Sequence, residues 1–272
     1  KGLEVMAHAV ELGRDPKSFG FSIEPAPAGF ELGVELHPYG VTALITAWNF
    51  PWILFCWKAC YALVAGNTLV WKPAEQTPAI SLALYDLFKE AGLPPGVLNL
   101  VYGGVDVGET LVLHPLVEMI SFTGSTKAGF RIAELNYVER VRRGLRPCAL
   151  LCEMGGKNAV IVMPDADLDA ASGHIVSGAF LSAGQRCTAT GLVIVHEDVS
   201  RQLIERIVAR TQALKLGLPT EDGVQVGPLV DERQMKHVLG FIDRAREDGL
   251  TIACGGHRLT LDPFQYGWFL HP

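Results

Sequence analysis

Short β-rich runs alternate with longer helical stretches along most of this chain. Runs dense in branched and aromatic residues occur at 41–45, 68–71, 97–102, 118–122, 159–163 and 192–195. Helical patterns occupy the stretches at about 51–65, 79–91, 164–180, 201–214 and 232–247. Strands that alternate with helices are typical of a parallel sheet whose strands are joined by crossover helices. The sequence therefore predicts the α/β fold class.

Size and charge exclude several classes of protein. The chain has 272 residues, 49% of them hydrophobic, which is enough to bury the core of one large or two ordinary domains. A formal net charge of −6 gives no electrostatic reason to expect a nucleic-acid partner. The most apolar stretch, 43–66, is interrupted by Asn49, Pro51 and Lys58, so we expect a buried strand and helix there rather than a membrane span. No signal peptide is recognised at Lys1.

The cysteine pattern predicts reduced thiols. The six cysteines lie at 56, 60, 148, 152, 187 and 254, and no two of them form a Cys-x-x-Cys pair. Buried free thiols are therefore favoured over disulfides or a zinc site, and no metal is expected. A cytoplasmic location follows from this pattern.

Cys187 stands apart from the other cysteines because of its neighbours. It lies in the segment Gly-Gln-Arg-Cys-Thr-Ala at 184–189, where Gly184 permits an exposed turn. A thiol acts as a nucleophile when its thiolate is stabilised or when a base lies nearby. This segment makes Cys187 the candidate nucleophile, although a cysteine alone would be assigned to the core.

Glu153 is a candidate general base. It follows the apolar run at 149–152 and precedes Gly155 and Gly156, so we expect it at the end of a buried strand. A carboxyl group in that position is expected to be partly desolvated, which favours its use as a base. The alternative is an ordinary surface acid.

Asn49 follows the run at 41–45 and precedes Phe50 and Pro51. By composition alone it would be a helix cap before Pro51, which suits a first helical turn. A side-chain amide at that point is also a candidate donor to an oxyanion.

A glycine-containing turn provides a candidate phosphate site. Gly124 and Ser125 follow the run at 118–122, and Gly129 comes four residues after Ser125. This pattern differs from the usual three-glycine dinucleotide fingerprint. Its position between a strand and a helix nevertheless suits a phosphate at a helix N-terminus, with the Ser125 hydroxyl as a donor.

These segments, together with Trp48-Asn49-Phe50-Pro51, resemble the aldehyde dehydrogenase superfamily over nearly the whole chain. The resemblance implies a Rossmann-like NAD-binding domain at 1–156, followed by an incomplete α/β catalytic domain at 157–272. It also implies that the chain is the middle part of a longer subunit, truncated at both ends. The catalytic residues that it implies are Cys187 as nucleophile, Glu153 as the base that activates water, and Asn49 at the oxyanion.

The resemblance also implies a set of cofactor-binding residues: Trp48, Lys72, Glu75, Gly104, Gly108, Gly124, Ser125, Gly129 and Gly155. Lys72 and Glu75 match the residues that hold the adenosine ribose in the family. A carboxylate at Glu75 accepts hydrogen bonds from a 2′-hydroxyl and repels a 2′-phosphate, so NAD is preferred. Lys72 keeps NADP open as an alternative. Lys58 matches a recurrent lysine of the family, for which we expect a structural role.

The implied substrate is a small-molecule aldehyde. The segment at 131–135 and Met154 resemble pyrroline-5-carboxylate dehydrogenases, whereas the segment at 185–190 resembles α-ketoglutarate-semialdehyde dehydrogenases. Both oxidise semialdehydes that carry a carboxylate, which is the expected substrate class. The full-length protein is expected to form a homo-oligomer, without a nucleic-acid or membrane partner.

Two other functions stay open on the sequence alone. The later Glu-x-Phe-Gly-Pro segment of the family, whose Glu and Phe hold the nicotinamide ribose, is not found in this sequence. One alternative is therefore a non-catalytic nucleotide-binding or interaction module. A thiol-dependent hydrolase would use Cys187 and Glu153 but leaves the cofactor segments unexplained.

Overall fold

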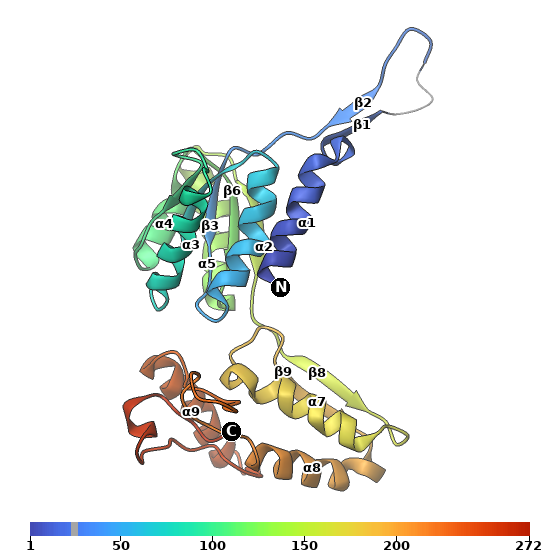
Figure 1. Cartoon of the computed structure of the whole chain (residues 1–272), viewed down its shortest axis with the longest axis vertical. Helices are drawn as coiled ribbons and strands as arrows, with labels where there is room; N and C mark the ends of the chain where they lie inside the picture. The colour runs from blue at the N-terminus through green and yellow to red at the C-terminus, as the bar shows by residue number, and fades with distance from the viewer. Residues whose placement is uncertain (23–26) are drawn as a thin grey trace. The chain divides into compact units, whose positions relative to one another are not determined.

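In the computed structural model, which describes residues 1–22 and 27–272, the chain divides into the units Lys1–Met154 and Gly155–Pro272. The sequence-based boundary was placed after Gly156. A parallel sheet that includes β3 and β6 forms the centre of the first unit (Figure 1). It has five strands, in the order β5-β4-β3-β6-β7. Its strands are β3 (Val41–Ile45), β4 (Thr68–Lys72), β5 (Leu98–Leu100), β6 (Val117–Thr123) and β7 (Ala149–Glu153). The predicted α/β fold with a parallel sheet is confirmed.

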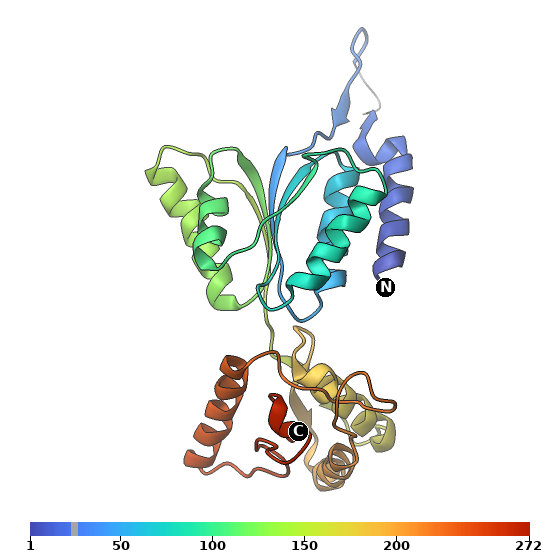
Figure 2. The ribbon, with the colours of Figure 1, turned by 60° about the vertical axis from the view of Figure 1, so that its left-hand side comes forward.

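Helices cover both faces of this sheet (Figure 2). On one face lie α1 (Gly2–Arg14), α2 (Pro51–Val64) and α3 (Pro78–Glu90). On the other lie α4 (Val105–Leu113), α5 (Thr126–Glu134), the one-turn π-helical segment η2 (Leu135–Glu139) and α6 (Arg140–Arg142). Two helical layers are what a parallel sheet requires, because both of its faces are apolar.

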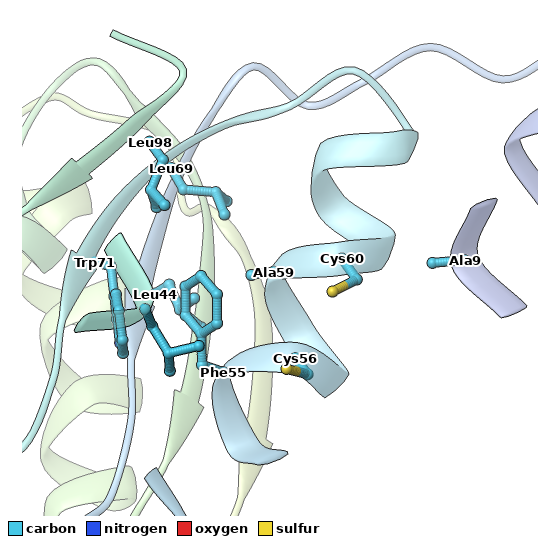
Figure 3. Packing of buried hydrophobic residues seen from close by; sticks show 10 residues of the cluster. Ala9, Leu44, Phe55, Cys56, Ala59, Cys60, Leu69, Trp71 and Leu98 are labelled. Carbon is cyan, nitrogen blue, oxygen red and sulfur yellow. The ribbon is translucent and has the colours of Figure 1, made fainter. Parts of the chain in front are cut away.

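Successive side chains of β3 point to opposite faces of the sheet and therefore belong to two different core clusters. Leu44 packs with Phe55 and Trp71 on the α2 side, whereas Ala43 and Ile45 belong to the cluster under α4 and α5. The rings of Phe55 and Trp71 lie 4.0 Å apart between centroids (Figure 3). Trp71 also satisfies its indole N–H, which donates to Thr46 Oγ1 at 2.9 Å. This ring pair therefore fixes α2 against the sheet without leaving a buried donor unpaired.

The same helix carries two buried thiols. Cys56 and Cys60 lie on the side of α2 that faces Ala9 of α1 (Figure 3). Both are free thiols. They serve as small apolar residues between two closely packed helices.

A small antiparallel pair precedes the sheet. After the 3₁₀ turn η1 (Pro16–Phe19), strand β1 (Gly20–Ser22) pairs with β2 (Gly33–Glu35) (Figure 1). Neither this pair nor helix α1 was expected from the sequence pattern.

The second unit contains a two-stranded parallel sheet and its helices. Strands β8 (Asn158–Val162) and β9 (Thr190–Val195) pair with each other. The helices are α7 (Leu168–Phe180), α8 (Glu197–Gln212) and α9 (Glu232–Glu247), with the 3₁₀ turns η3 (Leu181–Gly184) and η4 (Phe264–Tyr266). Val162, Ile175 and Leu203 form a core cluster of β8, α7 and α8.

One sequence-based expectation about this unit was wrong. The run at 159–163 was predicted to be a buried strand, but Ile161 is 67% exposed and Ile194 of β9 is 51% exposed. Within the described residues, helices pack against only one face of the β8–β9 pair. Val160 and Val162 point to that face. A continuous apolar run thus predicted a strand correctly without predicting its burial.

Candidate active site

The candidate residues of the first unit follow the carboxyl ends of the sheet strands. Asn49 follows β3, Glu75 follows β4, Gly104 follows β5, Gly124 follows β6, and Glu153 ends β7. All five strands are parallel, so these ends share one edge of the sheet. The fold therefore gathers residues that are more than a hundred positions apart in sequence.

The strand order also marks a particular place on this edge. From β3 the chain proceeds to β4 and β5 on one side, and then crosses to β6 and β7 on the other. Open α/β sheets bind ligands at such a switch point, beyond the carboxyl ends of the strands. Asn49 and Gly124 follow the two strands that flank it.

Asn49 is not the cap of helix α2. The residue in the capping position is Phe50, and Pro51 is the first residue of the helix. The helix-cap alternative for Asn49 is therefore wrong, and this half-buried amide lies in the connection between β3 and α2. Trp48, also half-buried, precedes it.

Lys72 is buried at the end of β4, with 9% of its surface exposed. Its Nζ donates to the Pro73 carbonyl oxygen at 3.4 Å. Burial lowers the pKa of Lys72, and the charges of Glu75 and Asp106 oppose this effect. A desolvated ammonium group near two carboxylates is an arrangement suited to recognising hydroxyl and charged groups of a ligand.

Gly124 and Ser125, at the start of α5, are suited to binding a phosphate. Ser125 is the N-cap of this helix, and its Oγ accepts from the Ala128 N–H at 3.2 Å. The hydroxyl hydrogen is still available as a donor, because a serine hydroxyl donates once and accepts twice. Gly124 donates its backbone N–H to the Glu153 carbonyl at 3.1 Å, which holds the turn against β7. Free N–H groups in the first turn of a helix are suited to binding an anion.

The candidate cofactor-binding glycines differ in whether neighbouring atoms leave room for a side chain. A Cβ atom at Gly129 would collide with Met154 Sδ, so this glycine lets α5 approach β7. At Gly108, a Cβ atom would lie 3.8 Å from Lys72 Cδ. Gly155 faces open space, with no atom within 4 Å of a Cβ built there. Gly129 thus has a packing role, while Gly155 leaves room for a ligand.

Glu153 ends β7 as predicted, but its side chain is exposed, so the expected desolvation was wrong. Strand β7 is at the edge of the sheet, and Leu151 is itself 43% exposed. Burial lowers the pKa of Lys58, and the charges of Glu153 and Cys152 oppose that effect. Lys58 Nζ donates to Ser121 Oγ at 3.2 Å. Lys58 therefore links α2 to β6 close to Glu153.

Cys187 belongs to the second unit and follows an unusual turn. Ser182, Ala183 and Gly184 have φ values of 59°, 53° and 70°, all in the left-handed region. For residues other than glycine this conformation costs about 1–2 kcal/mol each. Strained backbone of this kind concentrates at functional sites, where the surrounding structure holds it. Cys187 lies three residues after this turn and is exposed.

Asn158 holds the Cys187 loop, and the sequence analysis missed it. Its Nδ2 donates to the Cys187 carbonyl at 2.8 Å and to the Ala189 carbonyl at 2.9 Å. Gln185 Oε1 accepts from the Val230 N–H at 3.0 Å and attaches the loop to a second segment. Two amide side chains therefore fix the backbone on either side of the thiol.

The other thiols are less accessible than Cys187. Cys56, Cys60 and Cys148 are buried, and Cys152 and Cys254 are half-buried. Burial raises the pKa of Cys148, Cys152 and Cys254. Since the thiolate is the reactive form, exposure favours Cys187 as the reactive cysteine of this chain.

Gly184→Ala is expected to destabilise the second unit. A Cβ atom would lie 2.9 Å from the Ala179 carbonyl oxygen, in a residue that already has a left-handed φ. The conformation alone costs about 1–2 kcal/mol, and the close contact adds to it. Gly249→Ala is the matched control, because Gly249 has a φ of 75° and no atom within 4 Å of a Cβ. Urea unfolding measures both variants, and an equal loss in the two would contradict the tight packing of the Cys187 turn.

Residues 1–22 and 27–272, the part of the chain that the structure describes, contain neither a candidate membrane span nor a metal-type cluster of side chains. No helix there is both long and apolar enough to span a membrane. No cluster of three or more His, Cys, Asp or Glu side chains there has the geometry of a metal site.

Comparison with known proteins shows the family of this chain. Residues 2–272 match the sequence profile described as the aldehyde dehydrogenase family. The chain belongs to this family. A curated betaine aldehyde dehydrogenase of Brucella anthropi is 40% identical over 233 residues, which are 86% of this chain and 46% of that protein. The chain thus spans about half the length of the curated relatives it matches.

Solved structures of the family resemble the whole chain. A betaine aldehyde dehydrogenase of Staphylococcus aureus, in complex with NAD+, has a TM-score of 0.92 at 30% identity, covering 98% of this chain and 52% of that one. An NAD-dependent aldehyde dehydrogenase of Sinorhizobium meliloti has a TM-score of 0.91 at 30% identity, covering 100% and 52%. A 3,6-anhydro-L-galactose dehydrogenase in complex with NAP has a TM-score of 0.89 at 33% identity, covering 99% and 55%.

Proposed function

We propose that the protein containing this chain oxidises an aldehyde to a carboxylic acid through a covalent thioester on Cys187. The observation that carries the proposal is the exposed thiol of Cys187, on a loop fixed by Asn158, in a member of the aldehyde dehydrogenase family. Nucleophilic catalysis of this kind divides one difficult reaction into two easier ones.

In the first half of the proposed reaction, the Cys187 thiolate forms a bond through Sγ to the carbonyl carbon of the aldehyde. The carbonyl π electrons move to oxygen and give a thiohemiacetal oxyanion. The Asn49 amide is the proposed donor to that oxygen, with the backbone N–H of Cys187 as its companion. Removing one donor of such a pair usually lowers the rate about 10²–10³-fold.

The second half begins when a hydride leaves the former aldehyde carbon and the C=O bond forms again as a thioester. NAD, when bound, accepts this hydride. Glu153 then removes a proton from a water molecule, whose oxygen attacks the thioester carbon. The C–S bond breaks, the acid departs, the sulfur of Cys187 leaves as the thiolate, and Glu153 releases its proton to solvent, so that both residues are ready for another cycle. The position of Glu153 at the carboxyl end of β7, on the sheet edge where Asn49 follows β3, supports this role.

We also propose that the first unit binds NAD. Lys72 and Glu75 would hold the adenosine ribose, and Gly124 with Ser125 would hold a phosphate at the start of α5. The donor set fits the group: a buried ammonium, an exposed carboxylate and the free N–H groups of a helix N-terminus. The NAD+ complex of the Staphylococcus aureus relative supports the same choice.

Glu75→Gln is expected to relax the preference for NAD over NADP about tenfold. The substitution removes the charge that opposes a 2′-phosphate and keeps the shape of the side chain. The ratio of kcat/KM for the two cofactors measures the effect. Glu90→Gln, at the last residue of α3, is the control for an equal change in net charge. An unaltered ratio in Glu75→Gln would contradict the placement of the ribose at this carboxylate.

The proposed substrate is an aldehyde with a charged tail. The sequence segments quoted above favour a carboxylate-bearing semialdehyde, whereas the similar proteins named above include betaine aldehyde dehydrogenases. Rates of NADH formation with succinic, glutamic and α-ketoglutaric semialdehydes and with betaine aldehyde decide between the two. A higher kcat/KM for betaine aldehyde would overturn the semialdehyde proposal.

We propose a homo-oligomer for the full-length protein, which light scattering tests.

The experiment that tests the proposed function is the formation of NADH from NAD, or of NADPH from NADP, by the protein with this panel of aldehydes. Acid formation in equal amount supports the dehydrogenase. Binding of NAD by the folded protein without oxidation of any aldehyde would favour the nucleotide-binding module. Ester hydrolysis that needs no nucleotide, in the absence of aldehyde oxidation, would favour the thiol-dependent hydrolase.

A further inference from the structure

Asp106 lies beside the proposed ribose site, and no role has been given to it so far. It is an exposed residue in the first turn of α4, two positions after Gly104. A Cβ atom at Gly104 would lie 3.3 Å from Asp106 Oδ1 and 3.8 Å from Glu75 Oε2. The two carboxylates therefore approach one point in space, although they come from different connections of the sheet.

Lys72 connects this pair of acids to the buried end of β4. Both carboxylates act on its charge, and its aliphatic chain lies beside Gly108 of α4. The three side chains form one charged group with two negative charges and one positive charge. Lys72 contributes a buried cation, while Glu75 and Asp106 are exposed to a ligand that enters from solvent.

This arrangement is suited to discriminating between adenosine with a 2′-phosphate and adenosine without one. Lys72 and the N-terminus of α4 would both attract an additional phosphate. Two exposed carboxylates oppose that attraction, and they still accept hydrogen bonds from ribose hydroxyls. Lys72 offsets part of the negative charge of Glu75, so a second carboxylate strengthens the repulsion of a phosphate.

We propose that Asp106 is a second specificity-determining residue, which together with Glu75 disfavours a 2′-phosphate on the adenosine of the cofactor. The inference rests on the proposed nucleotide site of the first unit. It predicts that Asp106 affects the choice between two nucleotides more than the affinity for the one without the 2′-phosphate.

Isothermal titration calorimetry tests this without any catalytic turnover. The probes are adenosine 5′-monophosphate and adenosine 2′,5′-bisphosphate, which differ only by the 2′-phosphate. The proteins are the wild type, Asp106→Asn, Glu75→Gln, the double variant and the charge control Glu90→Gln. Glu90 ends α3, about 18 Å along that helix from its first residue. A thermal melt of each protein checks that the variants are folded.

We expect Asp106→Asn to raise the affinity for the bisphosphate about tenfold relative to the monophosphate. The double variant should shift the ratio further than either single variant, and Glu90→Gln should leave it unchanged. A ratio unaltered in folded Asp106→Asn, with monophosphate binding intact, would overturn the role of Asp106 alone. Failure of the wild type to bind the monophosphate or NAD would instead overturn the proposed nucleotide site, and with it this inference.

Discussion

Cys187→Ser is expected to lower aldehyde oxidation by about 10⁴-fold or more, because a serine hydroxyl without an adjacent base is a poor nucleophile. The substitution replaces one atom of an exposed side chain, so the backbone hydrogen bonds from Asn158 to the loop are kept. Its thermal stability should therefore match that of the wild type. Steady-state NADH formation across the aldehyde panel is the measurement.

Cys254→Ser provides the matched control for this variant. Cys254 is a half-buried thiol of the same unit, and burial raises its pKa. Its substitution should leave the rate within about twofold of the wild type, in line with the small effects of changes outside a site. Iodoacetamide should also label Cys187 before the other cysteines of the folded wild type. Substantial turnover by Cys187→Ser would reject Cys187 as the nucleophile.

Glu153→Gln is expected to separate the two halves of the reaction. An amide does not remove a proton from water, so the thioester should form and then persist. Rapid mixing with NAD and an aldehyde should show a burst of NADH that approaches one equivalent of active sites, followed by slow or absent turnover. The steady rate should fall about 10²–10⁴-fold, the usual contribution of a general base.

The same experiment on Glu90→Gln should give the wild-type time course. If Glu153→Gln retained the steady rate of the wild type, another group would have to activate the water. Loss of both burst and steady rate in a folded variant would also contradict the proposed role, since it would mean that Glu153 is needed before the thioester forms.

The sequence predicted the regular elements that carry an apolar pattern. Strand β3 and helix α9 have the predicted bounds, because a dense β-branched run and a capped amphipathic helix are local signals. Helix α8 begins at Glu197 rather than at 201, since His196 accepts a hydrogen bond from the Asp198 N–H and starts the helix earlier. Helix α7 begins at Leu168, where Asp167 caps it, and not at Pro164.

What the sequence did not predict depends on distant partners. The π-helical segment η2 contains Asn136, whose side chain pairs with the backbone of Cys148 on both its donor and its acceptor. Asn158 binds carbonyls 29 and 31 residues away, and nothing in its neighbours indicates this. The exposure of Glu153 follows from the position of β7 at the sheet edge, which is a property of strand order. The candidate residues were found by resemblance and by their places after strands, but their surroundings come from the fold.

The most direct test of the central claim is to trap the acyl group. Glu153→Gln would be incubated with NAD and an oxidised aldehyde, quenched in acid, digested and examined by mass spectrometry. We expect one acyl adduct, on the peptide that contains Cys187, formed only when nucleotide is present and in proportion to the NADH released. NADH release without an adduct, or an adduct on another cysteine, would contradict it.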